Sequence, residues 1–185
     1  MRLFAALMPS ADVLDGLELT LAPHVGAWPD LRWARREQLH VTLAFYGEMD
    51  ERGLDRLLPR LERAAGRYPP LQLTLAGAGV FPRGGAHARV LWTGVYGDRR
   101  TLARLAASAV AAGRRAGSGQ GGFEPKAFRS HLTLARCRRP MDVRPLVEKL
   151  AAFASTPWVA DSVHLIRSHL GPQVHYETLK TWPLG

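Results

Sequence analysis

The chain has 185 residues, of which 46% are hydrophobic, and its 25 Lys and Arg against 16 Asp and Glu give a net charge of +9. The composition excludes a mainly disordered protein, and the length fits one domain with a substantial core. No run of 18 apolar residues occurs, which excludes a transmembrane helix. The single cysteine, Cys137, excludes an internal disulfide and a cysteine-based zinc site, so we expect a cytoplasmic protein.

The positive charge favours an anionic partner such as nucleic acid. A second interpretation stays open, because 22 of the 25 basic residues are Arg and such a bias also follows from genome composition. Charge alone does not separate these two interpretations.

Hydrophobic periodicity predicts strands and helices in alternation. Pro59 predicts a break or a kink in the second helix. The glycine-rich segment 117–122 follows a helix and lacks the Gly-Lys-Ser/Thr ending of a P-loop, so we expect a mobile loop rather than a phosphate cradle. In chain order we expect a strand at 2–8, a helix at 10–24, a strand at 38–46, a helix at 50–67, strands at 71–77 and 88–95, a helix at 98–115, a strand at 130–136, a helix at 142–153 and strands in the tail, 158–182.

One pattern occurs twice, as His40-Val41-Thr42-Leu43-Ala44 and as His131-Leu132-Thr133-Leu134-Ala135. Because side chains alternate between the faces of a strand, each copy should place His, Thr and Ala on one face and its apolar residues in the core. Alternation also predicts that Phe45 joins the core. It points Arg136 away from His131, unless the strand bends near Ala135.

The repeated pair of an imidazole and a hydroxyl suits a particular chemistry. Two histidines that face one substrate can act as acid and base, because histidine exchanges a proton near neutral pH. Two threonine hydroxyls can donate to the non-bridging oxygens of a phosphate. The pattern therefore favours cleavage of a P–O bond without a metal, since each strand offers one good metal ligand and no third lies close. Coincidence stays open, because Leu, Thr and Ala are common strand residues.

The two motifs and their flanking segments resemble, in order, the 2H phosphoesterase superfamily, and within it the RNA 2′,3′-cyclic phosphodiesterase family, also called 2′-5′ RNA ligases. The resemblance covers essentially the whole chain, and besides the motifs it includes Arg2-Leu3-Phe4-Ala5-Ala6-Leu7, Gly79-Val80-Phe81-Pro82 and Ser168-His169-Leu170 with Tyr176. It implies an α+β fold of two pseudo-symmetric lobes, each an antiparallel sheet with helices on its outer face. The active site would lie in the cleft between the lobes of a single bilobal domain, residues 1–185.

The family's reaction is hydrolysis of an RNA 2′,3′-cyclic phosphate to a 2′-phosphomonoester. The resemblance implies that His40 is the proton donor and His131 the proton acceptor, while Thr42 and Thr133 hold the phosphoryl oxygens. It implies no metal and no organic cofactor. The partner would be RNA or a nucleotide with a 2′,3′-cyclic phosphate, and we expect a monomer with no membrane and no obligate protein partner.

Three further residues are candidates for substrate binding. The family often places an arginine at the position of Arg136, where it can stack on a base. Arg129 lies on a basic rim beside the second motif, although a solvated face would look the same. Tyr176 fits either packing or the cleft wall.

Two other functions stay open at this stage. One is 2′-5′ RNA ligation, which is the same chemistry in reverse. The other is a non-catalytic module that binds RNA through the same basic cleft, although a pure binder would gain little from two intact His and Thr pairs.

Overall fold

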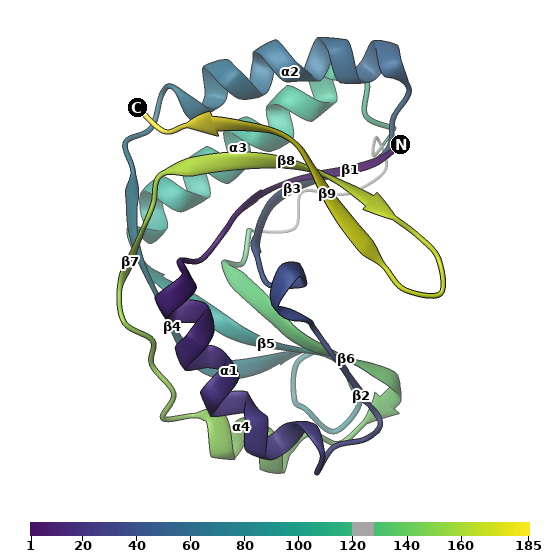
Figure 1. Ribbon diagram of the computed structural model, residues 1–185, viewed down its shortest axis with the longest axis vertical. Coiled ribbons are helices and arrows are strands. Elements are labelled where there is room, and N and C mark those ends of the chain that lie inside the picture. The colour runs from purple at the N-terminus through teal and green to yellow at the C-terminus, as the bar shows by residue number, and fades with distance from the viewer. Residues whose placement is uncertain (120–127) are drawn as a thin grey trace.

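The computed structural model describes residues 1–119 and 128–185, and Figure 1 shows a curled sheet with helices on its outer sides. Every strand and helix predicted from the sequence is present, with ends that shift by a few residues. The helices are α1 (Ala11–Val25), α2 (Glu51–Ala65), α3 (Arg99–Ala116) and α4 (Arg144–Leu150), with a short 3-10 helix η1 (Arg36–Gln38). The strands are β1 (Arg2–Leu7), β2 (Leu31–Trp33), β3 (Val41–Glu48), β4 (Leu71–Phe81), β5 (Ala88–Gly97), β6 (His131–Met141), β7 (Trp158–Ala160), β8 (Ser162–His169) and β9 (His175–Pro183).

The strands form one antiparallel sheet in the order β7-β4-β5-β6-β3-β1-β8-β9, with β2 paired to β6. Its two halves meet at β3 and β6, whose pairing consists of Val41 and Leu132. The predicted α+β class, with antiparallel sheets and outer helices, is confirmed. The two expected sheets are joined edge to edge, so the lobes are two halves of one sheet.

The helices are exchanged between the two halves. Helix α1 follows β1 along the chain but lies beside the β4–β5 half, whereas α3 follows β5 and packs on β3 of the other half (Figure 1). Residues from both halves form one continuous hydrophobic cluster. Each half of the sheet is therefore covered by a helix that follows a strand of the other half in the chain.

Helix α2 continues without interruption through Pro59, so the predicted break is absent. Proline removes one hydrogen-bond donor from the helix and leaves the carbonyl one turn earlier unpaired. Pro59 lies on the exposed side of α2, where water can satisfy that carbonyl.

The glycine-rich segment lies partly outside the described residues. Gly117, within the described part, ends α3 in the left-handed conformation with φ 88°, which favours glycine. The rest of the predicted loop, from residue 120, is outside the described ranges.

The regular alternation predicted for β3 fails after Thr42. Thr42 pairs with Ala6 and Ala44 with Ala5, so Leu43 is an extra residue that forms a β-bulge. Leu43 and Ala44 are consequently both buried, and Phe45 turns outward with 40% of its surface exposed. The prediction that Phe45 is a core residue is therefore wrong, as is the outward position of Ala44.

Tyr46 occupies the core position that was expected for Phe45. It is 1% exposed and its hydroxyl donates to the Ala109 carbonyl of α3 at 3.1 Å. The ring lies directly over Gly113, where an added Cβ would come within 2.4 Å of a ring carbon. This close approach seats α3 on β3 and requires glycine at position 113.

We expect the change Gly113→Ala to lower the free energy of unfolding by about 1–3 kcal/mol, because the methyl group would overpack against Tyr46. The matched control is Gly16→Ala in α1, where nothing lies within 4 Å of the added Cβ. The control should gain about 0.5–1 kcal/mol from helix propensity. Urea denaturation of both variants measures the difference, and equal effects would contradict this account of the α3–β3 contact.

Candidate active site

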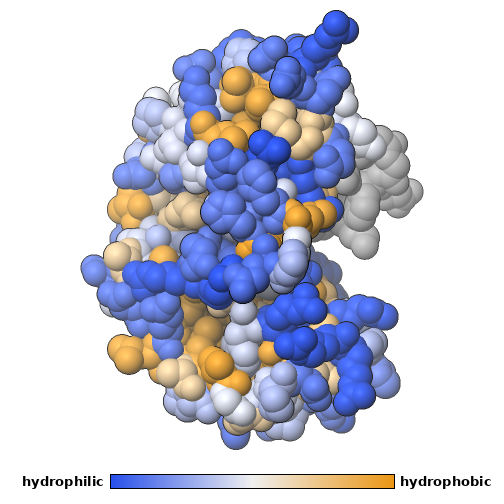
Figure 2. All heavy atoms as spheres, turned by 45° about the vertical axis from the view of Figure 1, so that its right-hand side comes forward, coloured by the Kyte–Doolittle hydropathy of each residue, from blue (hydrophilic) through white to orange (hydrophobic). Residues whose placement is uncertain are grey.

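The junction between the two halves of the sheet lies inside both repeated motifs. Val41 and Leu132, the paired residues, are the central members of the two His-x-Thr triplets, and both are fully buried. Their neighbours on either side therefore face away from the core. Antiparallel pairing sets Thr42 across from His131 and His40 across from Thr133. Two imidazoles and two hydroxyls thus share the concave side of the sheet, where Figure 2 shows the surface hollowed between the two halves.

The ring of His40 is held by its own backbone neighbourhood and by two aromatic side chains. Its Nδ1 lies 2.7 Å from the carbonyl oxygen of Gln38, so Nδ1 carries the proton and donates it. Its Nε2 lies 3.1 Å from Thr42 Oγ1 and accepts from that hydroxyl in the neutral ring. Phe4 and Tyr176 pack against the imidazole with centroid distances of 4.8 and 5.6 Å.

His131 has the equivalent arrangement in the other half. Its Nδ1 lies 2.7 Å from the Arg129 carbonyl oxygen, again two residues earlier in the chain. Phe81 and Trp92 pack against the ring with centroid distances of 5.0 and 6.1 Å. Each histidine therefore keeps one tautomer, with Nε2 directed away from its own backbone.

The surroundings of both histidines disfavour their charged forms. Burial is the main cause that lowers the pKa of His40 from its usual 6.5 to about 4; the hydrogen bond to Gln38 opposes this shift, and the charges of His131 and Arg136 add to it. Burial also lowers the pKa of His131, opposed by the hydrogen bond to Arg129 and assisted by Arg136. Both imidazoles are consequently neutral at neutral pH in the free protein.

Arg136 reaches this face because of a second β-bulge. Thr133 pairs with Trp92 and Ala135 with Leu91, so Leu134 is the extra residue in β6. Leu134 and Ala135 are both buried, and Arg136 returns to the face of His131. The bend near Ala135 that the predicted role of Arg136 requires is therefore present, and the predicted outward position of Ala135 is wrong.

The two remaining candidate residues, Tyr176 and Arg129, differ in how close their side chains lie to the histidines. Tyr176 packs edge-on against Phe4 and His40, so its side chain belongs to the wall of the site. Arg129 contributes its carbonyl to His131, while its exposed side chain lines a neighbouring pocket with Arg83 and Arg144. The structure thus brings Tyr176 to a histidine ring and directs Arg129 to the rim.

Sequence patterns did not predict that aromatic rings such as Phe4 and Trp92 pack against the two histidines. A signal was available for Phe4, because Leu3-Phe4-Ala5-Ala6-Leu7 is apolar on both faces and a strand of this type is covered on both sides. No comparable signal marks Trp92, which lies flat over Gly79: a Cβ there would come within 2.3 Å of its ring.

The other titratable side chains do not extend the site. Within the described residues, no group of three or more His, Cys, Asp or Glu is placed to hold a metal ion. His169 pairs with Glu177 at 2.8 Å, and His164 bonds to Thr181. Burial raises the pKa of the Cys137 thiol, which disfavours the reactive thiolate. In the described part of the chain no helix is long and apolar enough to cross a membrane.

Comparison with known sequences agrees with this geometry. The sequence model of the 2′-5′ RNA ligase superfamily matches residues 19–172. The chain belongs to this superfamily. The 2H phosphoesterase resemblance is thereby confirmed.

Two named proteins are similar to the chain over most of its length. A protein of Archaeoglobus fulgidus named RNA 2′,3′-cyclic phosphodiesterase is 31% identical over 177 residues, which are 94% of each chain. One of the same name from Methanothermobacter thermautotrophicus is 29% identical over 146 residues, 77% of this chain and 76% of the relative. Both relatives bear the name of an enzyme.

Two solved structures share the fold. A protein of Thermus thermophilus aligns with a TM-score of 0.81 at 26% identity, covering 100% of this chain and 98% of its own. LigT of E. coli aligns with a TM-score of 0.78 at 26% identity, covering 99% and 96%. LigT has also been crystallised with 3′-AMP.

We expect nuclear magnetic resonance titration to find His40 neutral, with the proton on Nδ1, down to about pH 4, because burial disfavours its charged form. The change Arg136→Gln should raise the pKa of both His40 and His131, since it removes a nearby positive charge. Arg139→Gln is the matched control, because Arg139 is 77% exposed and pairs with Asp30. A His40 pKa near 6.5, or equal effects of the two arginine variants, would contradict this electrostatic description.

Proposed function

We propose that this protein, acting as one bilobal unit, hydrolyses 2′,3′-cyclic phosphate ends of RNA to 2′-phosphomonoesters. The observation that carries the proposal is the pair of histidines on either side of the Val41–Leu132 junction, each held by a carbonyl at Nδ1. Relatives that bear the name RNA 2′,3′-cyclic phosphodiesterase support the choice of substrate.

In this proposal the two histidines act on opposite sides of one phosphorus atom. His131 Nε2 takes a proton from water as the water oxygen attacks phosphorus. The bond from phosphorus to the 3′ oxygen breaks, and His40 Nε2 gives its proton to that oxygen. The phosphate stays on the 2′ oxygen. General acid and base groups of this kind each contribute about 10²–10⁴-fold.

Because the pKa of His40 is low, the bound substrate helps to determine whether His40 is protonated. To act as the proton donor, His40 must carry a proton on Nε2, but the neutral ring of the free protein carries its proton on Nδ1. The negative charge of a bound cyclic phosphate favours the protonated form and raises this pKa. Once His40 is charged, Thr42 no longer donates to its Nε2 and its hydroxyl is free to donate to a phosphoryl oxygen.

The other polar groups stabilise the transition state and the bound base. Thr133, on the same face, donates to a second non-bridging oxygen as negative charge accumulates there. Arg136 supplies positive charge near both histidines and a planar group on which a base can stack. Tyr176 orients His40, and Arg129 guides further phosphates at the rim. The reaction so described uses no metal and no cofactor.

The proposal is tested with adenosine 2′,3′-cyclic phosphate and phosphorus nuclear magnetic resonance. We expect His40→Ala and His131→Ala each to lower kcat by about 10²–10⁴-fold while keeping the circular dichroism spectrum of the native fold. The control His87→Ala changes a histidine outside the site and should leave kcat unchanged. Adenosine 2′-monophosphate should be the product, and excess EDTA should not slow its formation.

Each alternative has its own outcome in this assay. A 3′-phosphate product would reverse the roles of the two histidines. Chelator-sensitive turnover that zinc restores would contradict the metal-free mechanism. Binding without turnover would favour the RNA-binding module. When an RNA with a 2′,3′-cyclic phosphate and a second RNA with a 5′-hydroxyl replace the nucleotide, joining of the two ends without hydrolysis would favour ligation.

A further inference from the structure

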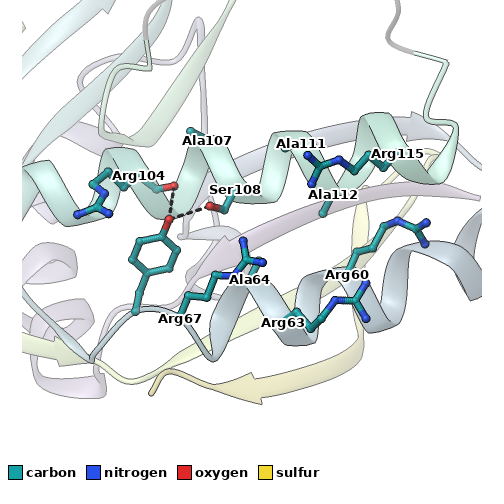
Figure 3. A pocket seen from close by; sticks show the side chains of 11 residues that line it. Arg60, Arg63, Ala64, Arg67, Arg104, Ala107, Ser108, Ala111, Ala112 and Arg115 are labelled. Atoms are coloured by element: carbon teal, nitrogen blue, oxygen red, sulfur yellow. Dashed lines mark hydrogen bonds between the residues drawn. The ribbon is translucent and has the colours of Figure 1, made fainter.

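A second basic site lies between helices α2 and α3, on the outer side of the molecule. The two helices enclose a groove of about 550 Å³, shown in Figure 3. Five arginines line it together with small residues and one tyrosine: Arg60, Arg63, Arg67, Arg104, Arg115, Ala64, Ala107, Ala111, Ala112, Ser108 and Tyr68. No carboxylate is among these lining residues.

The arginines of this α2–α3 groove have few partners within the protein. In the described part of the chain, none of the five is within 4.0 Å of a carboxylate in an ion pair. Arg60 donates to the Arg56 carbonyl, and Arg104 lies over the Tyr68 ring at 5.9 Å. The guanidinium groups thus offer most of their hydrogen-bond donors to an external anion.

Hydrogen bonds join the two helices at both ends of the groove, and small side chains lie between them. Arg56 Nε donates to the Ala116 carbonyl at one end, and the Tyr68 hydroxyl bonds to the Arg104 carbonyl and to Ser108 at the other. These contacts fix α2 and α3 side by side in opposite directions. The alanine side chains between them leave room for a ligand close to the helix surfaces.

The groove is long enough for several phosphates. Arg104 and Arg115 lie eleven positions apart on α3, which corresponds to about 16 Å at ~1.5 Å per residue. Successive phosphates of a stacked strand are separated by about 3.4 Å along its axis. The spacing therefore suits a chain of phosphates better than a single one.

This site is separate from the proposed active site. Helix α3 packs against the core face of β3 through Tyr46, whereas His40 and Thr42 face the opposite side of the sheet junction. A ligand in the groove therefore does not touch the two histidines.

We propose that the α2–α3 groove binds the phosphodiester backbone of an RNA strand at a distance from its reacting end. The identification of the ligand as RNA rests on the proposed function. Its identification as a polyanion rests on the five arginines, none of which forms an ion pair with a described carboxylate. A lipid surface fits less well, because no Trp, Phe or Leu lines the groove for insertion between lipids. The groove would add affinity for long substrates without changing the chemistry at the cyclic end.

The test compares two triple variants that each remove three positive charges from this part of the molecule. The groove variant is Arg60→Gln with Arg63→Gln and Arg67→Gln. The control is Arg52→Gln with Arg100→Gln and Arg114→Gln, three exposed arginines outside the groove. Fluorescence anisotropy measures binding of a labelled RNA of about 15 nucleotides with a 3′-hydroxyl end, over a range of salt concentrations.

We expect the groove variant to bind this RNA about tenfold or more weakly at ~0.1 M salt, and its salt slope to fall by about 0.7 for each contact removed. The control should lose far less, and both variants should hydrolyse adenosine 2′,3′-cyclic phosphate at the native kcat/KM. Because the RNA has no cyclic end, its binding is measured even if the proposed hydrolysis fails.

Two results would overturn the groove proposal. One is equal loss of RNA affinity in the groove variant and the control, which would mean general charge attraction. The other is unchanged RNA binding together with loss, in the groove variant alone, of binding to vesicles of phosphatidylserine and phosphatidylcholine, which would assign the groove to a lipid surface.

Discussion

The pairing of Val41 with Leu132 is the contact on which the arrangement of the site depends. It joins the two halves of the sheet, and each partner stands between a histidine and a threonine. Both side chains are fully buried, so the polar residues on either side must face the concave surface. Helix α3, which leaves one half and packs on the other, reinforces the same junction from behind. Fold stability and site geometry are thus linked at one point.

The two histidines have nearly equivalent surroundings on either side of this junction. Each histidine donates from Nδ1 to the carbonyl two residues earlier, and each packs against a pair of aromatic rings that also contact each other. The symmetry is incomplete: the more deeply buried ring is His40, with a pKa of about 4, and Arg136 on the second strand occupies the position equivalent to Phe45 on the first. Both rings are neutral in the free protein, so under the proposed mechanism the bound phosphate brings about the different protonation states of acid and base.

Local periodicity predicted the element order and placed the His and Thr of each motif on one strand face, as in His40 with Thr42 and His131 with Thr133. The antiparallel class came from the family resemblance. The sequence did not predict the bulges at Leu43 and Leu134, which depend on the register with β1 and β5 and which move Phe45 and Arg136 to the site face. The break that Pro59 could have caused is absent, because Pro59 lies on the exposed side of α2. The α2–α3 groove is lined by residues from two separate helices, so no local sequence pattern could predict it.

A crystal structure with adenosine 2′,3′-cyclic vanadate would test the two-histidine site most directly, because vanadate adopts the five-coordinate geometry of the transition state. We expect His40 Nε2 and His131 Nε2 each within about 2.6–3.2 Å of a different apical oxygen, with His40 beside the 3′ oxygen and both threonine hydroxyls on equatorial oxygens. A vanadate held by one histidine alone, or both rings on the same side of the vanadium atom, would contradict the proposed division of roles.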